Sequence, residues 1–224
     1  MVGALGLLLG DSRFPAGGYA HSLGLEQAVA DGLDAADVAS FIAARLRLVA
    51  EPEARLAVAA RRGALRDGVD AALIVDDEFA ARCPSPVLRE SARRLGASLL
   101  RSASTVWPGE GALIAGYRSR SRATPRPVAL GVVAAAIGLD DAGLAILALY
   151  DDAATVASAA LKLLALDPAV ASRWVAEQAV WIEAAALSVA ADERPLHEQP
   201  APAALGLELA AAVHGARTER FFVS

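Results

Sequence analysis

The chain has 224 residues, of which 55% are hydrophobic and only 5% aromatic, and its formal net charge at pH 7 is −5. This length suits one domain with a substantial core, so we expect a single domain over residues 1–224. The negative charge argues against general binding to nucleic acid. Cys83 is the single cysteine, which excludes an internal disulfide and suits a reducing compartment; we therefore expect a cytoplasmic protein.

Neither a signal sequence nor a membrane span is expected. The first residues lack the positively charged start and the small-residue cleavage site of a secretory signal. The longest uncharged run, residues 127–139, has 13 residues and includes two glycines. A membrane-spanning helix needs about 20 apolar residues, so this run predicts a core helix and no membrane partner.

The segment from Asp11 to Glu26, DSRFPAGGYAHSLGLE, is the most irregular part of the chain. An apolar run at residues 5–9 ends before it, and Pro15 keeps the segment from being one helix. We expect the next helix to begin around Ser22. The segment also gathers many hydrogen-bonding side chains, namely Asp11, Ser12, Arg13, Tyr19, His21 and Ser22. Such a density indicates more than a linker.

Caps and breaks divide the next part of the chain into helices. Asp34 is a candidate N-cap for a helix whose buried face is Val38, Phe41, Ile42, Leu46 and Val49. Pro52 either kinks this helix or starts another that runs through Arg62. Asp67-Gly68 predicts a turn, followed by a shorter helix to about Arg82.

A long helix from about residue 86 to 106 is predicted next, with Ser85 as N-cap and Pro86 in its first turn. One of its sides is small and would admit a close neighbour, through Ser91, Gly96, Ser98 and Ser102. Trp107-Pro108-Gly109 ends it. From Arg118 to Pro127 the chain is polar, basic and broken by prolines, which predicts a mobile loop.

The last part of the chain, from residue 127 onward, is also predicted to be helical. A helix over residues 127–138 carries Gly131 and Gly138 on nearly one side, which indicates close contacts there. Asp140 and Asp167 are the expected caps of the two following helices. Residues 194–202 form a connector, and a last amphipathic helix follows with the apolar residues Leu205, Leu209, Ala212 and Val213. No stretch alternates like a strand, so we predict an all-α, single-domain bundle of about eight to ten helices.

Sequence motifs for common chemistries are absent. The chain contains neither a phosphate-binding Gly-x-x-x-x-Gly-Lys-Ser/Thr loop nor a dinucleotide-binding Gly-x-Gly-x-x-Gly, and its single lysine, Lys162, lies in mid-helix. The three histidines and Cys83 lack the spacing of zinc ligands. We therefore expect a protein that is not an enzyme and that has no cofactor.

Two other functional classes stay open. Residues 20–24, AHSLG, resemble the nucleophile elbow of α/β-hydrolases around Ser22, and Asp192 with His197 or His214 would complete the order of a catalytic triad. That elbow requires a strand before the serine, and residues 15–19 cannot form one. The second alternative is a helical regulator that binds a small effector.

Two charged or apolar segments indicate binding surfaces. Residues 89–126 contain eight arginines against Glu90 and Glu110, which is either a solvated surface or a dock for an acidic partner. At the chain end, Phe221 and Phe222 are adjacent aromatics beside Arg220. We expect residues 216–224 to dock, either on the domain itself or on another chain.

Several motifs in chain order resemble those of the UreF family of urease accessory proteins. The resemblance rests on Asp11-Ser12, Pro15, Gly17, Ser22, Gly24, Leu25 and Glu26, on Ser91 and Gly96, on Val128 and Gly131, and on Arg220 to Ser224. It covers nearly the whole chain. The chain departs from the family pattern at Pro125, where the family usually has histidine.

The resemblance implies a non-enzymatic assembly chaperone of the nickel enzyme urease. Such proteins form homodimers and bind a urease accessory GTPase and a second accessory protein, called D or H, to deliver nickel into apo-urease. Their C-terminal tail becomes ordered in the complex. The residues that we expect to bind partners are Arg220, Phe221, Phe222, Ser224, His214, Tyr19, His21 and Glu26.

Overall fold

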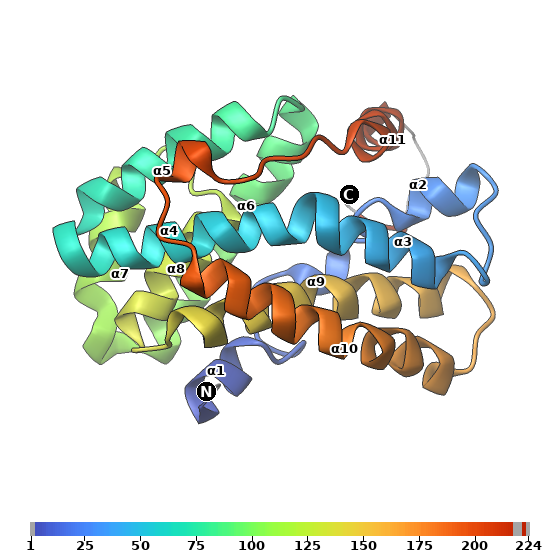
Figure 1. The fold of residues 1–224 in the computed structure, drawn as a ribbon, viewed down its shortest axis with the longest axis horizontal. Helices are drawn as coiled ribbons and strands as arrows, with labels where there is room; N and C mark the ends of the chain where they lie inside the picture. The colour runs from blue at the N-terminus through green and yellow to red at the C-terminus, as the bar shows by residue number, and fades with distance from the viewer. Residues whose placement is uncertain (1–2, 217–220, 223–224) are drawn as a thin grey trace.

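The computed structural model describes residues 3–216 and 221–222 (Figure 1). The described residues form helices and connections and contain no strand, so the prediction of an all-α bundle is confirmed. The α-helices are α1 (Ala4–Leu9), α2 (Leu25–Ala30), α3 (Val38–Arg45), α4 (Glu51–Asp67), α5 (Val69–Arg82), α6 (Pro86–Val106), α7 (Gly111–Arg120), α8 (Arg126–Ala136), α9 (Asp141–Leu163), α10 (Pro168–Ala191) and α11 (Leu205–Ala216). Single 3₁₀ turns lie at Gly18–Ala20, Pro108–Glu110 and Leu196–Glu198, and a π turn at Leu46–Ala50.

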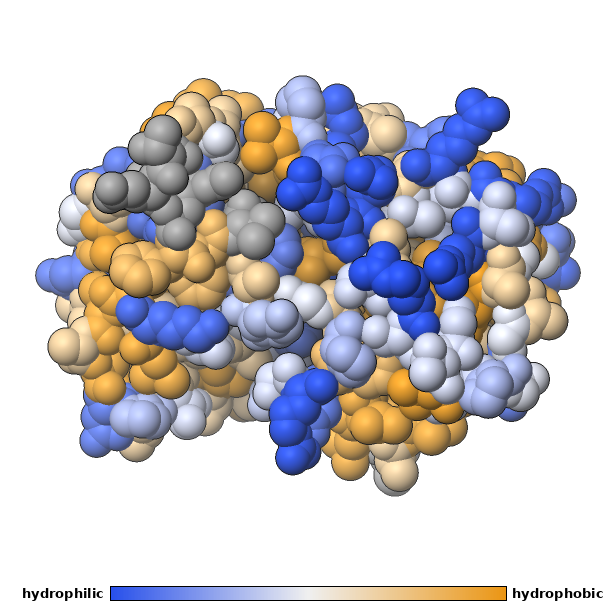
Figure 2. All heavy atoms as spheres, turned by 180° about the vertical axis from the view of Figure 1, so that it is seen from behind, coloured by the Kyte–Doolittle hydropathy of each residue, from blue (hydrophilic) through white to orange (hydrophobic). Residues whose placement is uncertain are grey.

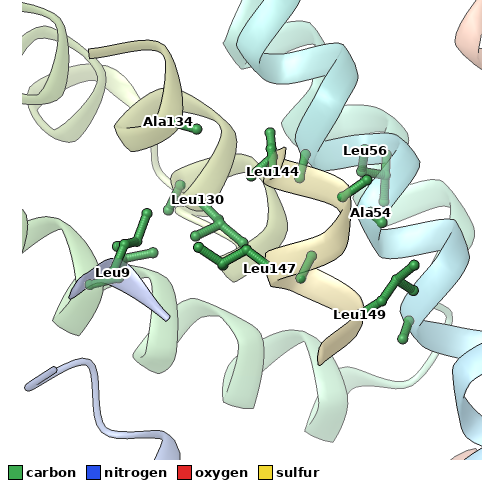
Figure 3. Close-up of a cluster of buried hydrophobic side chains, with 14 of the residues drawn as sticks. Leu9, Ala54, Leu56, Leu130, Ala134, Leu144, Leu147 and Leu149 are labelled. Atoms are coloured by element: carbon green, nitrogen blue, oxygen red, sulfur yellow. The ribbon is translucent and has the colours of Figure 1, made fainter. Parts of the chain in front are cut away.

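Helix α4 runs through the centre of the bundle, where α5, α8, α9 and α10 pack against it (Figure 1). Leucine and alanine side chains from α4, α8 and α9 meet in the core, among them Leu56, Leu130 and Leu144 (Figure 3). Helix α8 approaches α4 so closely that a Cβ on Gly131 would overlap the carbonyl oxygen of Ala57. The close contact predicted at Gly131 is therefore confirmed.

Gly138 has a different role from the one predicted. A Cβ there would meet no atom within 4 Å, and its φ is +72°. It lies just after α8 in the left-handed conformation that glycine adopts without strain. The prediction of a close contact at Gly138 was wrong because a glycine that ends a helix and one that admits a neighbouring helix look alike in the sequence.

Most predicted helix starts are confirmed by their caps. The side-chain oxygens of Ser85, Asp140 and Asp167 accept hydrogen bonds from backbone N–H groups of the first helical turn, at 3.4, 2.6 and 2.8 Å. Two predicted starts differ. Asp34 accepts from the N–H of Ala36 in a turn, and α3 begins at Val38. The helix expected to begin around Ser22 begins at Leu25, after Gly24. Pro52 lies in the first turn of α4, so it starts a helix after the π turn.

The segment predicted as a loop from Arg118 to Pro127 is shorter and more firmly packed. Helix α7 continues to Arg120, and only residues 121–125 connect it to α8. The Ser121 hydroxyl donates to buried Asp76 at 2.5 Å, and a Cβ on Gly96 of α6 would overlap the carbonyl oxygen of Thr124. The small side of α6 therefore accommodates this connection.

Helix α9 has the length and apolar composition of a membrane span, yet it lies in the bundle. In its most apolar window, 61% of the residues are buried inside the structure. Its outer neighbour α10 packs along it for most of its length (Figure 1). This pattern is that of a core helix.

Candidate functional site

The irregular N-terminal segment lies on α6 and ends in α2. The ring of Phe14 stacks on Trp107 with 5.5 Å between centroids, and the hydroxyl of Ser102 donates to the carbonyl oxygen of Pro15 at 2.7 Å. Gly17 and Gly24 have φ values of +88° and +94°, which other residues rarely adopt. The second of these turns places Glu26 in the first turn of α2.

Glu26 joins the beginning of the chain to its end. Its Oε1 accepts the N–H of Phe221 at 2.8 Å, and its Oε2 accepts the N–H of Phe222 at 3.0 Å. His214 Nε2 on α11 lies 2.9 Å from the same Oε2. Glu26 and His214 are both about 95% buried. We call Glu26, His214, Phe221 and Phe222 the Glu26 anchor.

The electrostatics of this anchor favour an ionised carboxylate. Burial by itself raises the pKa of Glu26, but the N–H of Phe221, the His214 ring and the N–H of Phe222 outweigh it. The pKa of Glu26 is therefore lower than its ordinary value of 4.5. A single negative charge thus holds three donors that come from the last part of the chain.

The two aromatic residues of the tail point in opposite directions. Phe222 is 5% exposed and belongs to the core, whereas Phe221 is 84% exposed. The ammonium group of Lys162, the only lysine, lies 5.0 Å from the centre of the Phe222 ring and donates to the carbonyl oxygen of Tyr19 at 3.1 Å. Sequence reasoning missed Lys162; the signal for it is that the only lysine of the chain lies in the last, largely apolar part of a long helix.

The remaining predicted residues are placed as follows. Tyr19 is 74% exposed, and its carbonyl oxygen accepts from Lys162, whose ammonium group lies over the Phe222 ring. His21 is buried, with its Nδ1 3.4 Å from the Ser91 hydroxyl. Burial, together with the charges of nearby arginines, lowers the pKa of His21 to about 4, so its ring is neutral at pH 7. Arg220 and Ser224 lie outside the described residues.

Helix α11 turns the apolar stripe noted in the sequence towards solvent and not towards the bundle. Leu205, Leu209 and Val213, from the apolar stripe, face outward and are 67%, 69% and 54% exposed. The inward side carries His214 and Leu207, whose side chain packs over Gly24. An amphipathic helix ordinarily turns its apolar stripe towards the bundle, but the side of α11 that faces inward is the one whose His214 contacts Glu26 and whose Leu207 meets Gly24. Seen from behind relative to Figure 1, the molecule has apolar surface on both sides of a central group of charged side chains (Figure 2).

The arginine-rich section is partly neutralised by acids of the same chain. Glu90 pairs with Arg93 and Arg94, and Arg120 pairs with Asp70. Arg101, Arg118 and Arg122 are exposed. A dock for an acidic partner at this section stays a prediction.

The hydrolase alternative lacks its framework. The described residues contain no strand that could carry a nucleophile elbow, and Ser22 is fully buried. Asp192 is bound by Arg55 and Arg194, each at 2.6 Å. Within the same described part of the chain, no group of three His, Cys, Asp or Glu side chains is arranged to hold a metal ion.

Comparison with known proteins gives one consistent result. The model of the UreF family matches residues 33–179. The urease accessory protein UreF of Mycobacterium sp. (strain JLS) is 38% identical over 164 residues, which cover 72% of this chain and 73% of that protein. The UreF proteins of Mycolicibacterium vanbaalenii and Mycobacterium tuberculosis (strain CDC 1551 / Oshkosh) are 40% and 39% identical over 165 and 168 residues, covering 72% and 73% of this chain and 73% and 74% of theirs. The residues matched by the family model run from α3 into α10 and leave out the Glu26 anchor.

Proposed function

The chain belongs to the UreF family of urease accessory proteins, which act in urease maturation, and on that premise we propose that it is a scaffold for the maturation complex. In this proposal it binds the urease accessory GTPase and a second accessory protein, D or H, and the complex delivers nickel into apo-urease. The cargo metal is a substrate of the complex. The chain itself performs no chemistry and acts by binding its partners in one arrangement and releasing them afterwards.

The observation that carries the proposal is the difference in burial between the two aromatic residues of the tail, Phe221 and Phe222. Phe222 is buried and its N–H is held by Glu26, so the tail has a fixed attachment. Phe221, next to it, is 84% exposed while its own N–H is also held by Glu26. A large aromatic side chain kept exposed on an anchored backbone is typical of a contact residue at a protein interface.

The outer side of α11 carries further exposed apolar side chains. Leu205, Leu209 and Val213 are each more than half exposed on the helix that carries His214 of the anchor. Contiguous exposed apolar side chains of this kind mark interaction sites. We name Phe221, Leu205, Leu209 and Val213 the tail-end surface and assign to it the contact with the second accessory protein.

The Glu26 anchor also links the tail to the N-terminal segment that leads to Glu26. Tyr19 and His21 lie in the segment that leads to Glu26, so a partner on the tail end would also contact or stabilise this segment. Arg220 and Ser224 flank the two aromatics in the sequence, and we assign them to the same contact. We also propose that the chain is a homodimer and that it acts in the cytoplasm. Light scattering of the purified chain measures its oligomeric state.

The first experiment compares partner capture by three chains. The full chain, a chain ending at Ala216 and the variant Phe221→Ala are each mixed with the accessory GTPase and the second accessory protein. We expect both altered chains to lose the ternary complex. Because the truncation also removes buried Phe222, only Phe221→Ala separates lost contact from lost folding, and its thermal unfolding should match that of the full chain.

Ile74→Ala provides the matched control, because Ile74 on α5 is 70% exposed and lies outside the tail-end surface. It should capture both partners normally. Urease activity and bound nickel, measured after co-expression with a urease cluster that lacks its own copy of this gene, should follow capture. Full capture and full urease activity with Phe221→Ala would contradict the assignment of the tail-end surface.

A further inference from the structure

A cavity of about 180 Å³ lies beneath α11. Helices α4 and α6 supply its walls, and Leu207 and Ala211 of α11 lie over it. Apolar side chains dominate the lining, including Leu48, Leu56 and Leu88. An engineered apolar cavity of about 150 Å³ in another protein holds benzene, so this space suits one ring with a small substituent.

The arginines that line the cavity are each paired with a carboxylate. Arg45 pairs with Asp152 at 2.9 Å, and Arg126 pairs with Asp151 at 2.5 Å. Each of these arginines therefore has its carboxylate within the structure. A third cavity-lining arginine, Arg82, pairs with Glu78 at 2.7 Å.

Two further carboxyl groups line the cavity without such a partner. Over residues 3–216 and 221–222, the side chains of Glu53 and Glu208 make neither a hydrogen bond nor an ion pair. Glu53 lies on central helix α4 and Glu208 on the covering helix α11. The carboxyl groups of the lining that lack an ion-pair partner among the described residues therefore come from two different helices, and Arg45 and Arg126 are the cations whose charges act on Glu53.

The ionisation of a neighbouring group reflects these two carboxyl groups. Burial, together with the charges of Glu53 and Glu208, raises the pKa of the Cys83 thiol to about 11, while the charge of Arg89 opposes the rise. Both carboxyl groups thus act on the same side chain. Burial raises the pKa of Glu53 and the charge of Asp152 adds to the rise, while the charges of Arg45 and Arg126 oppose it.

We propose that the cavity binds a small organic monocation, an ammonium group on a body about the size of a benzene ring. The ammonium group pairs with Glu53, and the apolar body packs against Leu56 and Leu88. Pockets of this kind combine an apolar lining with a few convergent polar groups, here including one with a shifted ionisation. A compact metal ion fits less well, because no triple of metal-ligating side chains is present in the described part of the chain.

The test uses the purified full-length chain and three probes of similar shape. Benzylammonium, neutral benzyl alcohol and anionic benzoate are each titrated by calorimetry and by thermal unfolding. We expect saturable binding and a raised Tm with benzylammonium, binding about tenfold weaker with the alcohol, and none with benzoate. No binding of benzylammonium, or equal binding of the ammonium and the alcohol, would overturn the proposal.

Variants locate the binding site. Glu53→Gln keeps the shape of the side chain and should weaken benzylammonium binding about tenfold while leaving the alcohol unchanged. Glu183→Gln, at an exposed position of α10, should change nothing. Ala92→Phe places a ring in the cavity and should abolish binding of both probes. If Ala92→Phe folds and still binds benzylammonium normally, or if Glu53→Gln binds it normally, the site lies elsewhere and the proposal fails.

This inference does not depend on the proposed scaffold function. Phe221→Ala, which should lose partner capture, leaves the lining of the cavity intact and should bind benzylammonium normally. Failure of one proposal is therefore distinguishable from failure of the other.

Discussion

Helices α8 and α11 are of similar length and are both rich in apolar residues, yet they are held in opposite ways. Nine of the 11 residues of α8 are buried, and Gly131 brings its backbone against α4. Of the 12 residues of α11, only His214 is buried. Helix α8 is fixed by many apolar contacts, whereas α11 is fixed largely by one polar attachment, the Glu26 anchor.

This difference predicts two levels of stability within one molecule. The bundle around α4 should open only with global unfolding, because its burial is continuous. The end that carries α11 and the tail should open at lower free energy, because few contacts hold it. A scaffold that takes up and releases partners through its tail benefits from this arrangement, since the tail end can rearrange while the bundle stays folded.

The largest expected effect comes from breaking the close packing of α8. Gly131→Ala places a methyl group against the backbone carbonyl of Ala57, which cannot rotate away as a side chain would. We expect the free energy of unfolding to fall by about 3 kcal/mol. Urea denaturation followed by circular dichroism measures this free energy of unfolding, and the stability of the whole bundle should fall.

Gly206→Ala is the matched control on α11. A Cβ at Gly206 would meet no atom within 4 Å. The change should be neutral or should stabilise the helix by up to about 1 kcal/mol, because alanine favours helix more than glycine does. Equal losses in Gly131→Ala and Gly206→Ala would show that the two helices are packed alike, against our comparison.

A smaller and more local effect is expected at the anchor. Glu26→Ala leaves the N–H groups of Phe221 and Phe222 and the ring of His214 without their acceptor. We expect a cost of about 2 kcal/mol, confined to the tail end. Hydrogen exchange should become faster in α11 while the amides of α4 and α8 keep their protection. Uniform acceleration across all helices would refute a local anchor.

The anchor also makes the stability of the tail end depend on pH. Because the pKa of Glu26 is lower in the folded protein than its ordinary 4.5, its stabilising effect is fully present above pH 4.5. It is lost as pH falls through the folded pKa, because protonation then removes the charge that holds the donors. The difference in α11 exchange between the wild-type chain and Glu26→Ala should therefore shrink below pH 4.5. A difference that grows on acidification would contradict the sign.

The sequence was most informative where the determining chemistry is local. Ser85, Asp140 and Asp167 cap the helices that follow them, because a cap depends only on the side chain and the next few N–H groups. Asp34 and Asp37 compete within one turn, and the helix begins after the second. The all-α class also followed from periodicity, which is a local property.

Contacts between distant segments were beyond such reasoning. Glu26 and His214 are 188 positions apart, and nothing in either segment specifies the other. Glu26 and His214 were both expected to bind partners, but not to bind each other. Likewise, an apolar stripe indicates that one side of α11 differs from the other without indicating which side meets the bundle.

The two faces of α11 give the smallest and sharpest test. Leu209→Ser changes an outward side chain that is 69% exposed, so stability should change by no more than about 0.5 kcal/mol. Leu207→Ser changes an inward side chain that packs over Gly24, and it should destabilise α11 by a larger amount. Capture of the second accessory protein should fall for Leu209→Ser, whose thermal unfolding is unchanged. If Leu209→Ser instead lowers stability as much as Leu207→Ser, α11 buries its apolar stripe after all, and the tail-end surface is part of the core.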